Sequence, residues 1–217
     1  MTGTQPDPRI AFFDSHADRW DSYGPPIAEV LARLDALRSV LPLAPSMDVL
    51  EIGCGTGNVT GWLATVVRPG RVTAMDFSPK MLALAAARGV DAELRLADVC
   101  SDDLGSSRFD AAFCMHVFPH FRDHAAALRN IARALKPAGW LIVLHLVGRQ
   151  TVNSVHTDAG GPVAGDHLPA PDVWPQLLTP AGLEMAQLTD RPDLFLVTAR
   201  KRASVARLDD NVPGRDL

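Results

Sequence analysis

The most informative part of this 217-residue chain is the run Val49-Leu50-Glu51-Ile52-Gly53-Cys54-Gly55-Thr56-Gly57-Asn58. A short apolar segment leads into three glycines at every second position, and a segment with helical spacing of apolar residues follows. Glycine hydrogens leave room for a ligand to approach the backbone of such a turn. The run therefore predicts a buried strand, then a glycine-rich turn that cradles a cofactor, and then a helix.

The rest of the chain extends this pattern. Short apolar runs alternate with amphipathic segments, which is typical of parallel strands joined by right-handed helical connections. The expected strands cover residues 47–52, 71–76, 92–96, 109–115, 141–146, 183–188 and 194–199. The expected helices cover residues 10–20, 27–41, 58–67, 79–88, 124–135 and 172–178. The last two strands are close in sequence, so we expect them to be antiparallel.

These elements predict an α/β fold of the doubly wound, Rossmann-like class. Its sheet should have seven strands, mostly parallel with an antiparallel last strand, and helices on both faces. We expect one domain over residues 1–202, in which residues 10–41 form a helical cap. Residues 148–171 are rich in glycine and proline, which predicts a lid-like loop without regular structure. Residues 203–217 form a polar tail.

The composition narrows the possible partners. With 21 basic and 25 acidic residues, the chain offers no overall positive charge for a phosphate backbone, which disfavours nucleic acid. Its apolar runs are far shorter than the roughly 20 residues that span a bilayer, and the N-terminus does not resemble a signal peptide. The three cysteines lie far apart and match neither a disulfide framework nor a zinc site. We therefore expect a cytoplasmic protein, either a monomer or a homodimer.

A carboxylate near the glycine turn indicates the kind of ligand. Asp76 closes the second expected strand, 19 positions after Gly57. In dinucleotide-binding folds, a carboxylate at this place accepts hydrogen bonds from the hydroxyls of a ribose. The ligand should therefore carry a nucleoside, although a tight turn without a ligand is the alternative for the glycines alone.

The pattern G-x-G-x-G after an acidic residue resembles the first motif of the class I S-adenosylmethionine (SAM)-dependent methyltransferases. The segments 72–82 and 96–99, the pair Phe109-Asp110 and the turn 133–139 resemble later motifs of that family, in the same order. The resemblance runs to about residue 201. It is closest in style to the ubiquinone and menaquinone C-methyltransferase-like group, whose N-terminal helix resembles residues 12–21, with Trp20 in place of the usual tyrosine.

This resemblance implies SAM as the cofactor and S-adenosylhomocysteine as the product. Glu51 and the backbone of residues 53–57 would hold the methionine part, Asp76 the ribose, and Phe77, Asp98 and Val99 the adenine. Simple core packing is the alternative for Phe77. The complete set of expected cofactor contacts is Glu51, Gly53, Cys54, Gly55, Gly57, Asn58, Asp76, Phe77, Ser78, Met81, Asp98, Val99 and His116.

Histidines follow the fourth and fifth strands, where ligands gather in open α/β sheets. Histidine can accept a proton near neutral pH, so His120 is the first candidate for a catalytic base, followed by His116 and His145. A structural hydrogen bond is the alternative for each. A base matters only if the acceptor must lose a proton, because orientation supplies much of the catalysis of methyl transfer.

Candidates for binding the acceptor are the aromatic ring of Phe118, after the fourth strand, and polar side chains of the expected lid. The polar candidates are Arg149, Asn153, His156 and Asp166. Two alternatives stay open for this segment. One is a divalent metal held by His145, His156, Asp166 and His120, although their spacing matches no metal template. The other is a solvated loop without a role.

The sequence thus predicts a methyltransferase that acts on an oxygen, nitrogen, sulfur or carbon atom of a small molecule. Natural-product metabolism is favoured over quinone methylation, because no basic amphipathic helix is present for membrane docking. The alternatives are an RNA or protein methyltransferase and a SAM-binding protein without activity.

Overall fold

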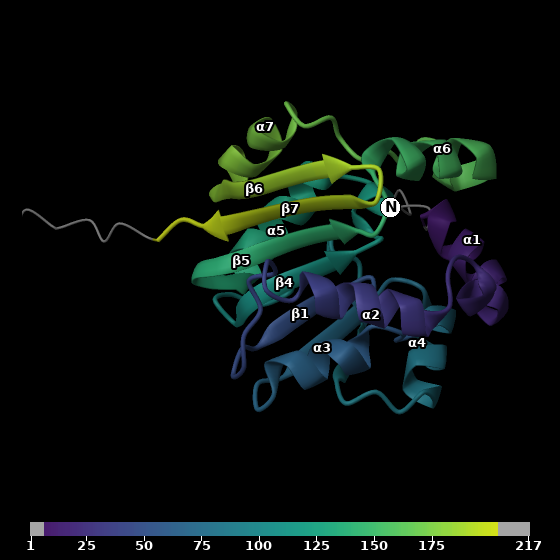
Figure 1. The fold of residues 1–217 in the computed structure, drawn as a ribbon, viewed down its shortest axis with the longest axis horizontal. Coiled ribbons are helices and arrows are strands. Elements are labelled where there is room, and N and C mark those ends of the chain that lie inside the picture. The colour runs from purple at the N-terminus through teal and green to yellow at the C-terminus, as the bar shows by residue number, and fades with distance from the viewer. Residues whose placement is uncertain (1–6, 204–217) are drawn as a thin grey trace, which may run out of the picture.

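A computed structural model of the chain describes residues 7–203, which form one seven-stranded sheet between helices (Figure 1). The strand order is β3-β2-β1-β4-β5-β7-β6. Neighbours from β3 to β5 are parallel, and β7 is antiparallel to both β5 and β6. The strands are β1 (Val49–Ile52), β2 (Val72–Asp76), β3 (Glu93–Leu96), β4 (Phe109–Met115), β5 (Leu135–His145), β6 (Leu183–Arg191) and β7 (Leu194–Lys201). The predicted fold class is confirmed.

Helices cover both faces of the sheet. The α-helices are α1 (Pro8–His16), α2 (Ile27–Leu37), α3 (Thr60–Val67), α4 (Pro79–Ala87), α5 (His124–Ala134), α6 (Arg149–Ala159) and α7 (Trp174–Leu178). Short 3₁₀ helices are η1 (Ala17–Ser22), η2 (Phe118–His120), η3 (Gly161–Val163) and η4 (Thr179–Ala181). No helix within residues 7–203 is long and apolar enough to cross a membrane.

Alternation along the central strands creates two cores. In β4, Phe113 packs against α2 and α3 on one face, whereas Ala112 and Cys114 belong to the core around α5 and α7 on the other. Successive side chains of a strand point to opposite faces, so a strand that is buried on both sides consists of apolar residues throughout. This explains why the central strands appear as continuous apolar runs in the sequence.

Two expectations about local structure are wrong. Residues 148–171 are not a loop throughout, because α6 spans Arg149–Ala159. The breakers lie around this helix: Gly148 precedes it and Gly160, with φ +67°, ends it. Strand β5 begins at Leu135, earlier than expected, because Leu135 pairs with Phe109 across an irregular register. The expected polar tail, apart from its first residue, lies outside the described residues.

Helices α1 and α6 lie at the carboxyl edge of the parallel strands (Figure 1), whereas α2 packs on a face of the sheet. The first expected helix is divided into α1 and η1 at Ala17. Helix α1 contacts α4 and η3, so segments far apart in sequence meet above the same sheet edge. This arrangement encloses the place where ligands bind in doubly wound folds.

Trp174 joins the C-terminal segment to the sheet. It is fully buried, and its ring centroid lies 4.7 Å from that of Phe118 and 5.8 Å from that of Phe195. Replacement of a buried aromatic residue by alanine removes contacts and leaves a cavity.

We expect Trp174→Ala to lower the free energy of unfolding by about 3–5 kcal/mol in urea denaturation followed by circular dichroism. Trp174→Phe is the control and should lose clearly less; equal losses would contradict this packing role.

Candidate functional site

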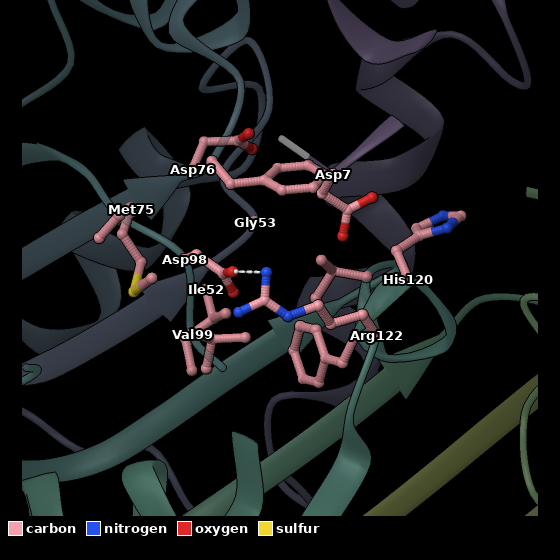
Figure 2. Close-up of a pocket in the computed structure, with 13 residues that line it drawn as sticks. Asp7, Ile52, Gly53, Met75, Asp76, Asp98, Val99, His120 and Arg122 are labelled. Atoms are coloured by element: carbon pink, nitrogen blue, oxygen red, sulfur yellow. Dashed lines mark ion pairs between the residues drawn. The ribbon is translucent and has the colours of Figure 1, made fainter. Parts of the chain in front are cut away.

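A cleft opens at the carboxyl ends of β1, β2 and β4, with about 380 Å³ of space between its walls. Six of the predicted residues line it, and they come from four segments of the chain: Gly53, Asp76, Phe77, Asp98, Val99 and His120. Figure 2 shows His120 across the cleft from Asp98 and Val99.

The glycine turn has a backbone that only glycine adopts easily. Gly53, Gly55 and Gly57 have φ values of +70°, +54° and +81°. A Cβ atom on Gly53 would lie 2.2 Å from Cγ2 of Val117, so even alanine would collide there. The turn is therefore fixed by conformation and by close packing, and Gly53 is the glycine of the turn that lines the cleft.

Asp76 holds the turn in place. Its Oδ2 accepts a hydrogen bond from the backbone N–H of Gly55 at 2.8 Å, and its Oδ1 accepts one from Ser78 at 2.9 Å. Burial raises the pKa of Asp76 above its ordinary value, whereas these two hydrogen bonds favour the charged form. Hydroxyl donors from a ligand would stabilise the carboxylate further, and a ribose carries two of them.

The opposite wall suits a flat base. Asp98 forms an ion pair with Arg122 at 2.9 Å (Figure 2). Its Oδ1 also accepts a hydrogen bond from the backbone N–H of Cys100 at 2.8 Å. Phe77 and Val99 supply apolar surface beside this carboxylate. A planar heterocycle with an amino donor matches both features.

Glu51 lies beneath the glycine turn and does not line the cleft. The side chain is buried, and its Oε2 has no hydrogen-bond partner among the described residues. Burial, together with the nearby charge of Asp76, raises the pKa of Glu51 to about 7. An orphaned buried oxygen of this kind is expensive unless a ligand or ordered water meets it.

The helical cap is hydrogen-bonded to the cofactor side of the cleft. Asp21 in η1 accepts from Thr56 Oγ1 at 2.6 Å and from Asn58 Nδ2 at 2.8 Å. Asp14 in α1 accepts from Ser78 Oγ at 2.5 Å. The cap therefore rests directly on the glycine turn and on the start of α4.

The structure brings together three residues that the sequence singled out separately. His120 Nδ1 lies 2.8 Å from Asp166 Oδ2, and the ring of His156 lies 4.7 Å from that of His120. His156 Nδ1 also contacts the backbone carbonyl of Asp166. Arg9 of α1 completes this cluster, since its Nε lies 2.9 Å from Asp166 Oδ2.

His116 and His145, the other two histidines predicted for the site, form a separate pair at the ends of β4 and β5. The rings of His116 and His145 are 5.0 Å apart and nearly perpendicular. His145 is buried, its Nε2 has no partner among residues 7–203, and burial lowers its pKa well below the ordinary value. His145 is therefore an uncharged side chain, buried at the end of β5.

The remaining predicted residues have structural contacts of their own. Arg149 pairs with Asp190, and Asn153 exchanges two hydrogen bonds with the backbone of Leu168. Phe118 is fully buried against Trp174 and Phe121. Buried positions behind the cleft also hold Cys54, Ser78 and Met81. Within residues 7–203, no group of three or more His, Cys, Asp or Glu side chains is arranged to hold a metal, so the metal alternative finds no support.

Comparison with known proteins finds similar methyltransferases. The sequence profile described as "Methyltransferase domain" matches residues 50–143. The ubiquinone biosynthesis O-methyltransferase of Xanthomonas oryzae is 33% identical over 142 residues, which are 60% of this chain and 57% of the relative. The demethylmenaquinone methyltransferase of Thermus thermophilus is 28% identical over 80% of this chain and 91% of the relative. The chain is therefore similar to class I SAM-dependent methyltransferases over residues 50–143 and beyond.

The fold agrees with this similarity. A chain in the complex between the Haloferax volcanii Trm112 methyltransferase activator and a methyltransferase superposes with a TM-score of 0.70 at 19% identity. The match covers 88% of this chain and 97% of that one. The chain spans little more than half of the length of the Xanthomonas relative, 57%. The predicted resemblance to SAM-dependent methyltransferases is confirmed.

The residues present fit SAM by their own chemistry. The cleft offers Asp76 for two ribose hydroxyls and Asp98 beside an apolar wall for the adenine. The glycine turn leaves room for the methionine part, and the unpartnered oxygen of Glu51 lies directly behind it. The individual contacts of these residues with SAM stay predictions.

Four charged residues of the site were missed in the sequence. Asp7 and Arg122 line the cleft, Asp21 ties the cap to the turn, and Arg9 binds Asp166. Arg122 follows the fourth strand closely, and this position is a usable signal for ligand contact. No local pattern marks Arg9, because its partner is 157 positions away.

The raised pKa of Glu51 predicts a pH-dependent stability. A carboxyl whose pKa rises from 4.5 to about 7 on folding contributes stability below about pH 4.5 that is lost as the pH rises to about 7. Glu51→Gln lacks this loss. In urea denaturation of the ligand-free protein, we expect the stability of Glu51→Gln relative to the parent to improve by about 2–3 kcal/mol from pH 5 to pH 8. Glu184→Gln, at an exposed position on β6, is the control; an equal change in both variants would contradict this assignment.

Proposed function

We propose that this chain transfers the methyl group of SAM to a small-molecule acceptor that binds between the cap and α6. The observation that carries this proposal is the continuity of the cleft. Its cofactor side, with Asp76 and Asp98, leads to His120, which touches the Asp166 segment and α1. A donor and an acceptor bound on these two sides would be adjacent and enclosed.

The roles of the chain's own residues follow from the geometry. SAM supplies a methyl group on a positively charged sulfur, which is already activated for transfer. Asp76 holds the ribose, Phe77, Asp98 and Val99 hold the adenine, and the glycine turn accommodates the methionine part. The cap, through Asp14 and Asp21, closes this side and excludes water.

A small acceptor is favoured because the site is covered. Helices α1 and α6 both lie over the strand ends (Figure 1), which disfavours a long polymer as the acceptor. Within small molecules, we place the acceptor in natural-product metabolism, since the sequence has no basic amphipathic helix for docking to a membrane that holds quinones. The three cysteines form no disulfide, which suits the reducing cytoplasm.

Binding of the cofactor is the first test. We expect the purified protein to bind SAM and S-adenosylhomocysteine in calorimetric titration, and Asp76→Ala to weaken binding by about 1–3 kcal/mol through loss of charge-assisted hydrogen bonds. Asp110→Asn is the matched control, since Asp110 pairs with Lys136 at the opposite end of β4. Unchanged affinity in a folded Asp76→Ala protein would contradict the ribose assignment.

Turnover is the second test. Incubation with SAM labelled in the methyl group and with a panel of caffeic acid, thiophenol and benzylamine should label at least one acceptor. His120→Gln should leave SAM affinity unchanged and slow turnover by about 100-fold or more if a base is needed. SAM binding without label in any acceptor, natural-product extracts included, would favour a SAM-binding protein without activity.

A further inference from the structure

Arg9, Asp166 and His120 form a chain of polar contacts above the cleft, called here the Arg9–Asp166–His120 triad. Asp166 is buried, with 3% of its surface exposed, and both of its carboxylate oxygens accept hydrogen bonds. Arg9 Nε lies 3.1 Å from Oδ1 and 2.9 Å from Oδ2, and His120 Nδ1 lies 2.8 Å from Oδ2. The three residues come from α1, η2 and the segment after η3, so folding alone brings them together.

We propose that Asp166 is a positioning residue that holds His120 as the general base for an acceptor with a phenolic hydroxyl. This inference rests on the proposed function and assigns the chemistry of the acceptor side of the same cleft. It changes the expected role of Asp166 from contact with the acceptor to contact with the base.

Burial and hydrogen bonds together set the protonation state of Asp166. Burial by itself raises the pKa of the Asp166 carboxyl, but hydrogen bonds from His120 and Arg9 outweigh it and lower the pKa below the ordinary value. The side chain is therefore a carboxylate at neutral pH, and a carboxylate can only accept hydrogen bonds. Nδ1 of His120 must then carry the hydrogen.

The tautomer of His120 follows from this contact. A neutral imidazole carries one hydrogen, so Nε2 has a free lone pair when Nδ1 donates to Asp166. The side chain of His120 also lines the cleft. The ring of Phe13 lies edge-on at 4.9 Å and limits its rotation. A fixed ring with one free nitrogen is what a general base requires.

The step balances without any further reactant. The phenol gives its proton to Nε2 of His120, and an electron pair of its oxygen forms the bond to the methyl carbon. The pair of the broken carbon–sulfur bond stays on sulfur, which yields neutral S-adenosylhomocysteine. The charge on the His120 imidazolium is stabilised by the Asp166 carboxylate, and the proton later passes to water.

The surroundings favour a phenol over an aliphatic amine. Phe13 lies 5.6 Å from Phe77, and Phe121 lines the same cleft, so aromatic rings surround the space beside His120. Aromatic walls suit an aromatic acceptor. A free amine already has a lone pair and would need no base.

Other charged or titratable groups also act on His120. They are Asp7 and Arg9 of the α1 segment, Asp76 of β2, His116 after β4, Arg122 after η2, His145 of β5 and His156 of α6. Asp166 differs from all of these because it is hydrogen-bonded to the ring itself.

A purely structural triad would also join α1 to the segment after α6, so the test must separate the two roles. Nuclear magnetic resonance of protein with ¹⁵N-labelled histidine, saturated with S-adenosylhomocysteine, reads the tautomer of His120 without turnover. His120→Gln assigns the signal. We expect hydrogen on Nδ1 and a free Nε2 in the parent protein, and we expect Asp166→Asn to shift the hydrogen towards Nε2, because the asparagine amide can donate to Nδ1. Hydrogen on Nε2 in the parent protein, or an unchanged tautomer in Asp166→Asn, would overturn the proposal.

Kinetics with caffeic acid give the second readout. In Asp166→Asn, kcat should fall by about 10- to 100-fold with little change in KM, because the ring then carries its hydrogen on the wrong nitrogen. A purely structural role would instead raise KM. Asp110→Asn should change neither quantity. Calorimetry with SAM checks that each variant still binds the cofactor.

The outcomes also separate this inference from the proposed function. Methylation of benzylamine but not of caffeic acid would leave the proposed function intact and overturn the phenol assignment. SAM binding with no methylated product would contradict the proposed function, whereas the resonance of His120 would still decide whether Asp166 fixes its tautomer.

Discussion

The contact between Asp76 and the backbone N–H of Gly55 holds the cofactor side of this molecule together. It connects the end of β2 to the middle of the glycine turn after β1, at 2.8 Å. The same carboxylate binds the start of α4 through Ser78, and the cap reaches both places through Asp21 and Asp14. The Asp76 carboxylate thus connects the ends of β1 and β2 to the start of α4, where the cap also binds. The same side chain lines the cleft.

The sheet could be predicted because its rules are local. Strands buried on both faces are apolar runs, and their alternation with amphipathic segments fixes a parallel sheet with helical connections. Errors arose where local signals compete. Glycines at 148 and 160 indicate breaks, but they lie around α6, and the eleven residues of that helix contain none. The early start of β5 depends on the pairing of Leu135 with Phe109, which no local pattern records.

The two halves of the site differ in the same way. The cofactor half is built from short sequence stretches with fixed spacing, such as the three glycines and Asp76, so several residues that line it could be named in advance, although Asp7 and Arg122 were missed. The acceptor half depends on contacts such as that between Arg9 and Asp166, which are 157 positions apart. Asp166 and His120 were both recognised as candidates, but their direct contact required the fold.

The acceptor side can accommodate more substitutions than the cofactor side. Glycines at positive φ and a carboxylate shared by two backbone donors tolerate almost no substitution, since each change strains the turn or leaves a buried group unpaired. The acceptor side is held by side chains on α1, η2 and the segment after α6, none of which belongs to the central sheet. Substitutions there can reshape the space beside His120 while the sheet and the glycine turn stay the same. Relatives that share this cofactor half can therefore act on different acceptors, and the identity of the acceptor has to be sought in α1 and α6, not in the glycine motif.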